Sequence, residues 1–102
     1  ELPESSLENE HVWHIYAVRV QHREVVLNAL HKAGVGAGIH YPIPIHLLGA
    51  FEFLGHKNGD FRNAESAASE MISLPMFPGI SEEQQVIVSK AIINAVKDSQ
   101  DN

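Results

Sequence analysis

The hydrophobic pattern of the first forty residues alternates between strand-like and helix-like segments. Residues 11–20, HVWHIYAVRV, carry β-branched and aromatic side chains on both faces, which predicts a strand covered on both sides. Residues 22–33 then place apolar side chains at helical spacing, and Gly34 supplies a C-terminal stop. A second short strand is predicted over residues 35–41, where glycines permit close approach of other backbone segments.

The remainder of the pattern is mostly helical. A proline-rich loop leads into a short apolar helix over residues 46–55, HLLGAFEFLG, and Asp60 is a credible N-cap for a helix reaching about Ser73. After a brief extended piece, Ser81 and Gln84 form a capping-box pattern that opens the last helix. The predicted core stripe of that helix is Val88, Ala91, Ile92, Ala95 and Val96.

This order of elements predicts an α+β domain in which helices cover a small sheet. The length of 102 residues fits one domain. We expect residues 1–10, which are acidic and polar, to be a linker or inter-domain lead-in. We expect the domain itself to span residues 11–97, followed by a polar tail over residues 98–102.

Charge and cysteine content narrow the functional classes. The net charge of −6 and the pI of about 5.5, with seven scattered basic residues, argue against a nucleic-acid or anionic-membrane surface. The absence of cysteine excludes disulfide scaffolds, thiolate zinc sites and cysteine nucleophiles. No apolar run approaches the ~20 residues that span a bilayer, so a cytoplasmic location is expected.

Residues 38–46, GIHYPIPIH, concentrate polar-tipped rings in a segment that suits neither a helix nor a central strand. His40 and Tyr41 end the second predicted strand, and Pro42 restricts the backbone on both of its sides. Such a rigid loop can hold side chains in one orientation for a ligand. It can equally be a connection whose histidine and tyrosine cap neighbouring backbone. The residues by themselves leave both interpretations open.

Other kinds of site are disfavoured by spacing. His40 and His46 are separated by a segment with two prolines, and neither an HExxH pattern nor a nearby carboxylate supports a metal site. The glycines of AGVGAG, residues 33–38, follow a helix and do not open one, which argues against a phosphate cradle. No Gly-x-Ser-x-Gly elbow is present, so nothing in the chain makes a self-contained catalytic centre.

Three segments carry a resemblance to a known family: GIHYPIPIH, the GDF…AE pattern at residues 59–65, and SLPMFPGIS at residues 73–81. Together with HVWHIYAVRV, in this order and with similar spacings, the stretch from about residue 11 to residue 96 resembles the C-terminal small domain of the pyridoxal-phosphate sugar aminotransferases of the DegT/DnrJ/StrS type. The resemblance implies the fold type I architecture, with a small, mostly antiparallel sheet covered by helices.

The resemblance also implies a function. Enzymes of this family move an amino group, usually from glutamate, onto a keto carbon of a nucleotide-linked sugar, and work as homodimers with active sites at the subunit interface. The cofactor, pyridoxal 5′-phosphate, is bound mainly by a large domain. The segment matching His40 and Tyr41 contacts the sugar nucleotide, which makes both residues candidate substrate contacts and His46 a weaker candidate.

No residue here matches the family's Schiff-base lysine, its pyridinium-pairing aspartate or its phosphate-binding residues. The four lysines, Lys32, Lys57, Lys90 and Lys97, occupy polar helix-end or turn positions, without the apolar surroundings that would depress the pKa of an amine. The chain is therefore expected to be a fragment that cannot transaminate alone. The alternative is a stand-alone, non-catalytic α+β module that senses a ligand or mediates an interaction. A fragment should expose a large apolar patch, for which Trp13, Phe51, Phe53 and Phe77 are candidates, whereas a self-sufficient module should not.

Overall fold

The computed structural model describes residues 1–100 and contains a two-stranded antiparallel sheet. Strand β1 (Tyr16–Arg19) pairs with β2 (Met71–Leu74), so that Tyr16 lies opposite Leu74 and Val18 opposite Ile72. The α+β class and the small antiparallel sheet are confirmed. Arg19 also pairs through its backbone with Glu1, at 2.9 and 3.0 Å between nitrogen and oxygen, which brings the start of the chain beside β1.

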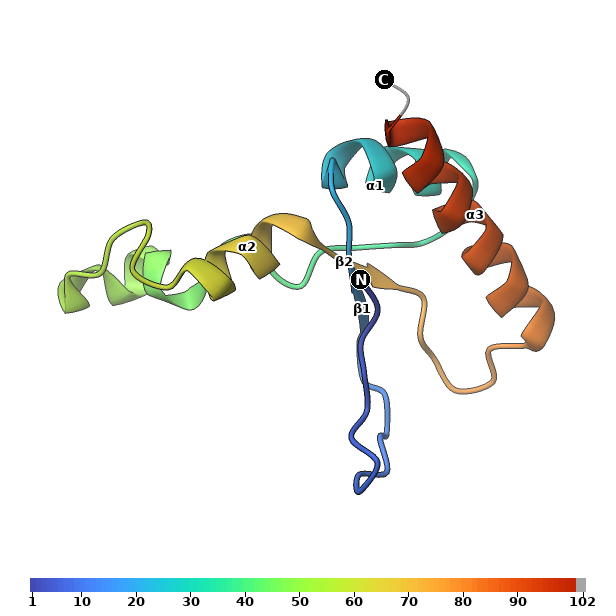
Figure 1. The fold of residues 1–102 in the computed structure, drawn as a ribbon, viewed down its shortest axis with the longest axis horizontal. Coiled ribbons are helices and arrows are strands. Elements are labelled where there is room, and N and C mark those ends of the chain that lie inside the picture. The colour runs from blue at the N-terminus through green and yellow to red at the C-terminus, as the bar shows by residue number, and fades with distance from the viewer. Residues whose placement is uncertain (101–102) are drawn as a thin grey trace.

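Two helices pack together on the sheet and enclose the core. These are α1 (Arg23–Lys32) and α3 (Glu82–Gln100), drawn side by side in Figure 1. The buried apolar cluster draws on both strands and both helices, and it consists of Val18, Val26, Leu30, Val35, Ala37, Ile72 and Ala95. The remaining members of the predicted stripe of the last helix, Val88, Ala91, Ile92 and Val96, pack against this cluster.

Two predicted helix ends are confirmed. Gly34 has a φ of +76°, the left-handed conformation that ends α1 without the steric cost a side chain would carry. At the start of α3, the Ser81 backbone N–H donates to Gln84 Oε1 at 2.9 Å, and the Gln84 N–H donates to Ser81 Oγ at 3.2 Å. This reciprocal pair is the capping box expected from the sequence.

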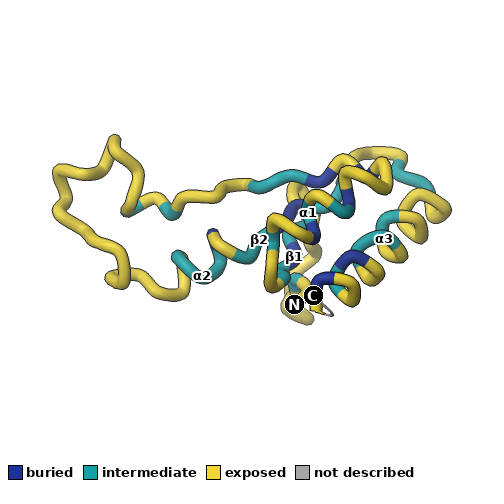
Figure 2. Tube along the Cα trace, turned by 90° about the horizontal axis from the view of Figure 1, so that it is seen from above, coloured by how far each residue is buried: buried dark blue, intermediate teal, exposed yellow. Residues whose placement is uncertain are grey.

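An extended arm, residues 42–61, projects from the packed part of the molecule (Figures 1 and 2). It contains two 3₁₀ helices, Ile45–Leu47 and Gly49–Leu54, and returns to the sheet through helix α2 (Arg62–Glu70). The radius of gyration is 15.6 Å, against about 13 Å for a compact domain of this length. Figure 2 shows that buried positions gather around the sheet, α1 and α3, whereas the arm is mostly exposed.

Of the two strands predicted in the first half, the first is longer than the observed strand and the second is not formed. In the first, residues 11–15 leave the sheet because Trp13 has a φ of +43° and its N–H donates to His11 Nδ1 at 2.9 Å. The second, residues 35–41, is wrong as a strand. Its only pairing among the described residues is an isolated bridge between Gly38 and Ser73, since a tight turn with an N–H of Ala37 bonded to the Val35 carbonyl interrupts the extended backbone.

The predicted helix from Asp60 to Ser73 is wrong at both ends. Asp60 does not cap α2, because its Oδ2 accepts the Lys57 N–H at 2.8 Å and closes a turn before the helix. At the other end the helix stops at Glu70, since pairing with β1 requires Met71 to adopt extended backbone. The short apolar helix predicted over residues 46–55 is present as the two 3₁₀ pieces of the arm.

Helix α3 continues to Gln100, so residues 98–100 of the expected tail are helical, while residues 101–102 lie outside the described part. Within residues 1–100, none of the helices combines the length and the apolar character needed to cross a membrane.

Candidate functional site

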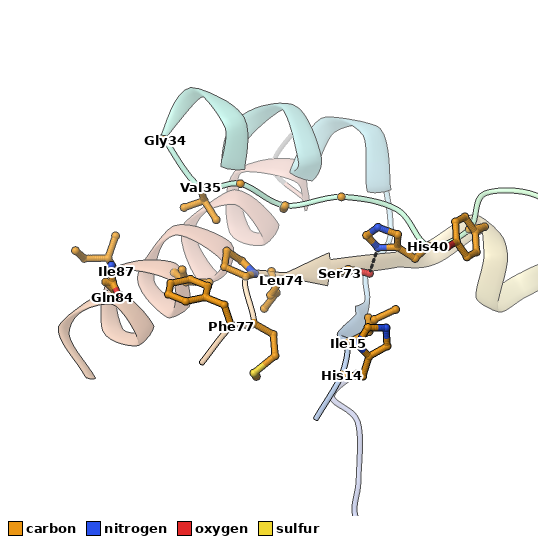
Figure 3. A pocket seen from close by; sticks show the side chains of 17 residues that line it. His14, Ile15, Gly34, Val35, His40, Ser73, Leu74, Phe77, Gln84 and Ile87 are labelled. Carbon is orange, nitrogen blue, oxygen red and sulfur yellow. Dashed lines mark hydrogen bonds between the residues drawn. The ribbon is translucent and has the colours of Figure 1, made fainter. Parts of the chain in front are cut away.

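An open cleft of about 790 Å³ lies where the ends of both strands meet the segment after α1 and the beginning of α3 (Figure 3). Backbone of residues 34–38 forms one wall, and residues 73–77 form another. The side chains around it that offer hydrogen-bonding groups are those of His14, His40, Tyr41, Ser73 and Gln84.

His40 lies in this cleft because the Gly38–Ser73 bridge fixes the backbone just before it. The bridge consists of two hydrogen bonds, from the Gly38 N–H to the Ser73 carbonyl at 3.0 Å and from the Ser73 N–H to the Gly38 carbonyl at 2.8 Å. The imidazole Nδ1 of His40 lies 2.9 Å from Ser73 Oγ, the contact drawn as a dashed line in Figure 3. The ring remains exposed on its other side.

Tyr41 stands at the mouth of the cleft and is 71% exposed. Its ring meets the His40 ring edge to face, with centroids 5.5 Å apart, and the peptide bond between the two residues is cis. Pro44 is extended, with a φ of −64° and a ψ of 147°, and begins the first 3₁₀ helix of the arm. The side chains of His40 and Tyr41 are therefore brought together at one open surface, and neither is enclosed in the protein interior.

The described lining of the cleft contains no Lys, Arg, Asp or Glu side chain. The polar groups present are imidazole, phenol, hydroxyl and carboxamide, which exchange single hydrogen bonds with neutral or charged oxygens. Such a set suits recognition of a hydroxyl-rich ligand, whereas a strongly charged phosphate would usually be met by Arg or Lys side chains.

His46 is not brought to the same position as His40. It lies on the arm, where its Nε2 is 2.9 Å from Glu65 Oε1 and its ring packs on Phe61 with centroids 4.8 Å apart. It lines a separate, largely apolar hollow between the arm and α2, and Tyr41 borders both this hollow and the cleft. Whether His46 touches a substrate stays a prediction.

Glu65 is the centre of a hydrogen-bond cluster that the sequence analysis did not identify. Its carboxylate accepts the Gly59 N–H at 2.9 and 2.8 Å, the Phe61 N–H at 3.2 Å and the ring N–H of His46. Burial acts to raise the pKa of this carboxyl, but the backbone donors of Gly59 and Phe61 and the His46 ring outweigh burial, so the pKa lies below its ordinary value. The cluster ties the arm to the start of α2.

Ser73 was also missed as a site residue, because the sequence pattern assigned it to the end of a helix. As part of β2 it is buried and lies beneath His40. The sequence signal for Ser73 is the segment SLPMFPGIS, which begins at this residue and is one of the segments that carry the family resemblance.

The residues present do not make a site for pyridoxal phosphate. All four lysines are exposed, and none of them lines the cleft. Among residues 1–100, no three side chains of the types that commonly bind metals come close enough together to hold an ion. No covalent or metal-assisted step can therefore be assigned to this chain's own residues.

Comparison with known proteins gives a consistent result. Residues 1–93 match the DegT/DnrJ/EryC1/StrS aminotransferase family. A pleiotropic regulatory protein of Geobacillus stearothermophilus is 43% identical over 82 residues, which are 80% of this chain and 22% of that protein. The dTDP-3-amino-3,4,6-trideoxy-alpha-D-glucose transaminase of Streptomyces venezuelae is 32% identical over 91 residues, which are 89% of this chain and 24% of that protein.

Solved structures show the same relationship. DesV of S. venezuelae, crystallised in complex with a ketimine intermediate, superposes with a TM-score of 0.88 and 30% identity over 94% of this chain and 26% of its own. A DegT/DnrJ/EryC1/StrS aminotransferase from Brucella abortus superposes with a TM-score of 0.85 and 28% identity, with the same coverage. The chain thus spans about a quarter of the length of these relatives.

Proposed function

The chain belongs to the DegT/DnrJ/EryC1/StrS aminotransferase family, and on that premise we propose that it is the small-domain part of an enzyme that aminates a nucleotide-linked keto-sugar. The family depends on pyridoxal phosphate and includes nucleotide-sugar transaminases. In this proposal residues 11–97 are the small domain and residues 1–10 its lead-in. The cofactor is held by protein outside this chain, glutamate is the amino donor, and the full protein is a homodimer.

The observation that carries the proposal is the pairing of His40 and Tyr41 at the open cleft. Both residues are exposed at one surface, and Ser73 lies against the His40 ring. Their hydrogen-bonding groups fit the hydroxyl and keto oxygens of a sugar. Their role is to bind and orient the sugar, and the arm and cleft walls would exclude water when the rest of the protein closes over them.

His46 is a weaker substrate contact in this proposal. Its Nε2 is already engaged by Glu65, and its side chain is 9% exposed, so Nδ1 is the atom left for a ligand. Its main contribution is to hold the arm in place beside Tyr41.

Exposed apolar side chains favour the fragment over a self-sufficient module. Phe53 on the arm is 81% exposed, and Phe77 beside the cleft is 46% exposed, whereas Trp13 is partly buried. The arm exposes further apolar side chains, namely Ile43, Ile45, Leu47, Leu48, Phe51, Leu54 and Phe61. A surface of this kind normally lies against other protein.

A second candidate function is ligand sensing without catalysis. It is favoured by the regulatory names of two relatives, the G. stearothermophilus protein and the erythromycin biosynthesis sensory transduction protein EryC1. The two candidates share the sugar-binding role of His40 and Tyr41 and differ in whether the complete protein turns over.

The test is glutamate-dependent amination of dTDP- and UDP-linked keto-sugars by the longer polypeptide that carries this chain. We expect turnover, with Tyr41→Phe and His40→Ala each raising KM about tenfold, the effect of losing one hydrogen bond to a bound substrate. Tyr16→Phe, which changes a tyrosine that does not line the cleft, is the matched control. Sugar-nucleotide binding without turnover would support the sensing module. Unchanged KM in both cleft variants would overturn the assignment of these residues.

A further inference from the structure

The contact between Ser73 and His40 joins a buried hydroxyl to an exposed imidazole. Ser73 is 6% exposed, and its backbone is held on both sides, by pairing with Ala17 in the sheet and by the bridge to Gly38. The position of its Oγ is thus set by the strand. Because His40 Nδ1 lies 2.9 Å from this fixed oxygen, the hydroxyl determines where one edge of the ring lies.

The absence of a side chain at Gly38 leaves room for the His40 ring on the side of the backbone of residue 38. A Cβ built on Gly38 would lie 3.3 Å from Cε1 of His40 and 4.0 Å from its Nε2, so the ring would have to move by a few tenths of an ångström to admit a side chain there. Gly38 and His40 both line the cleft, and the ring nitrogen of His40 that does not contact Ser73, Nε2, lies on the side of the imidazole away from that contact (Figure 3).

Hydrogen-bond satisfaction decides which ring nitrogen carries the proton. Within residues 1–100, the only recorded partner of Ser73 Oγ is His40 Nδ1. If Nδ1 carried the proton, the buried hydroxyl would accept it and keep its own proton without an acceptor, which is unfavourable. If the hydroxyl donates to Nδ1 instead, both groups are satisfied, and the single N–H of a neutral imidazole is on Nε2.

We propose that Ser73 and Gly38 are positioning residues that hold His40 as the Nε2–H tautomer, with this N–H aimed into the cleft to donate to an acceptor oxygen of the bound nucleotide-sugar. The proposal rests on the proposed function for the identity of the ligand. The positioning itself depends on the chain's own residues and can be measured without a ligand.

The experiment is nitrogen NMR of the histidine-labelled chain at a pH where His40 is neutral. We expect the wild-type chain to show His40 mainly protonated at Nε2. Ser73→Val, which removes the hydroxyl, should lower the ratio of the Nε2–H to the Nδ1–H form about fivefold, as expected for one net hydrogen bond. Ser73→Thr has the same shape as the valine variant and keeps the hydroxyl, so it should retain the wild-type ratio.

Two results would overturn the positioning role: a wild-type His40 protonated mainly at Nδ1, or a valine variant with the same ratio as the threonine variant. Gly38→Ala provides a second probe that leaves Ser73 intact. It should shift the ring signals of His40 and leave those of His56 unchanged, because His56 lies on the arm away from the cleft. Unmoved His40 signals in this variant would remove Gly38 from the proposal.

A titration of the longer polypeptide with dTDP-glucose and UDP-glucose separates the two levels of inference. Movement of the His40 Nε2 signal on binding supports donation to the ligand. If the tautomer responds to Ser73 as expected and neither ligand moves the signal, the positioning stands and the substrate role of His40 is overturned.

Discussion

Leu30 is one of very few side chains that hold the packed part of this molecule together. Among the described residues, the largest side chains that are almost fully buried are those of Leu30, Ile72 and Val26. Val26 and Leu30 belong to α1 and Ile72 belongs to β2, and all three lie in the same cluster. A core this small gives a low free energy of unfolding, because the apolar surface that is buried on folding provides most of the stabilisation.

We expect Leu30→Ala to lower the free energy of unfolding by about 2–5 kcal/mol, the range seen for large-to-small changes that leave a cavity. Val25→Ala is the matched control, since Val25 lies on the same helix and is 53% exposed. Its effect should be within about 0.5 kcal/mol. Urea unfolding followed by circular dichroism measures both, and equal effects of the two substitutions would contradict the assignment of the core.

At the scale of elements, helices α2 and α3 differ in how the backbone N–H groups at their starts are hydrogen-bonded. Helix α3 begins with the reciprocal bonds of Ser81 and Gln84, whereas α2 has no side-chain bond from its N-cap residue Phe61. In α2 the Glu65 carboxylate reaches back to the Phe61 N–H, and it also holds Gly59 and the His46 ring. The arm is therefore anchored by one side chain.

Ser81→Ala should destabilise the chain by about 1 kcal/mol, because the Gln84 N–H loses its acceptor. Ser89→Ala is the control, since the Ser89 hydroxyl donates to the Gln85 carbonyl one turn earlier in the same helix, and its removal should have little effect. Thermal unfolding of both variants provides the comparison. A loss in Ser89→Ala as large as that in Ser81→Ala would count against the capping box as the cause.

The Glu65 cluster should respond to acid. The pKa of this carboxyl is lower in the folded chain than its ordinary value of 4.5, so its stabilising contribution is present above that value and disappears as pH falls through the folded pKa. Glu65→Gln, which removes the charge, should therefore be less stable than wild type at neutral pH. The difference should narrow as the pH is lowered from neutral to about pH 3, because protonation of the folded carboxyl removes the charge.

Urea unfolding of both proteins at the two pH values measures this difference. Glu52→Gln is a control on the same arm, because the structure gives the Glu52 carboxylate no hydrogen bond or ion pair within the described residues. A stability gap between wild type and Glu65→Gln that stays constant down to the acidic pH would show that the carboxylate charge is not what holds the arm.

At the scale of the whole molecule, the described chain consists of a small packed part and a long exposed arm. Apolar side chains of the arm, such as those of Phe53 and Ile45, are largely exposed within residues 1–100. The cleft likewise offers neutral hydrogen-bonding groups without a lysine for covalent chemistry. Both features are what the proposed small-domain role requires, and the chain spans about a quarter of the length of its relatives.

We expect this chain, incubated with pyridoxal phosphate, glutamate and a keto-sugar nucleotide, to form no amino-sugar. Its four lysines are exposed, and none of them lines the cleft. Product analysis by mass spectrometry and the imine absorbance of the cofactor provide the measurement. The S. venezuelae transaminase is the positive control, and robust transamination by this chain alone would refute the fragment hypothesis.

Local signals predicted the parts of the fold that depend on neighbours within a turn or two. Gly34 as a helix stop, the Ser81–Gln84 capping box and the apolar stripe of α3 were all correct because each depends on a spacing of three or four residues.

The sequence by itself determined the class of the fold and the family, and it singled out His40 and Tyr41 as the first candidates for the site. Only the tertiary structure decided that Met71–Leu74 is a strand, that Ser73 lies under a histidine 33 positions away, and that Glu65 binds His46. Helical spacing in α2 and β-pairing of the residues after it compete on nearly equal terms locally. The contacts that make these residues a strand come from β1, more than fifty residues earlier in the chain. A local sequence pattern holds no information about contacts at that separation.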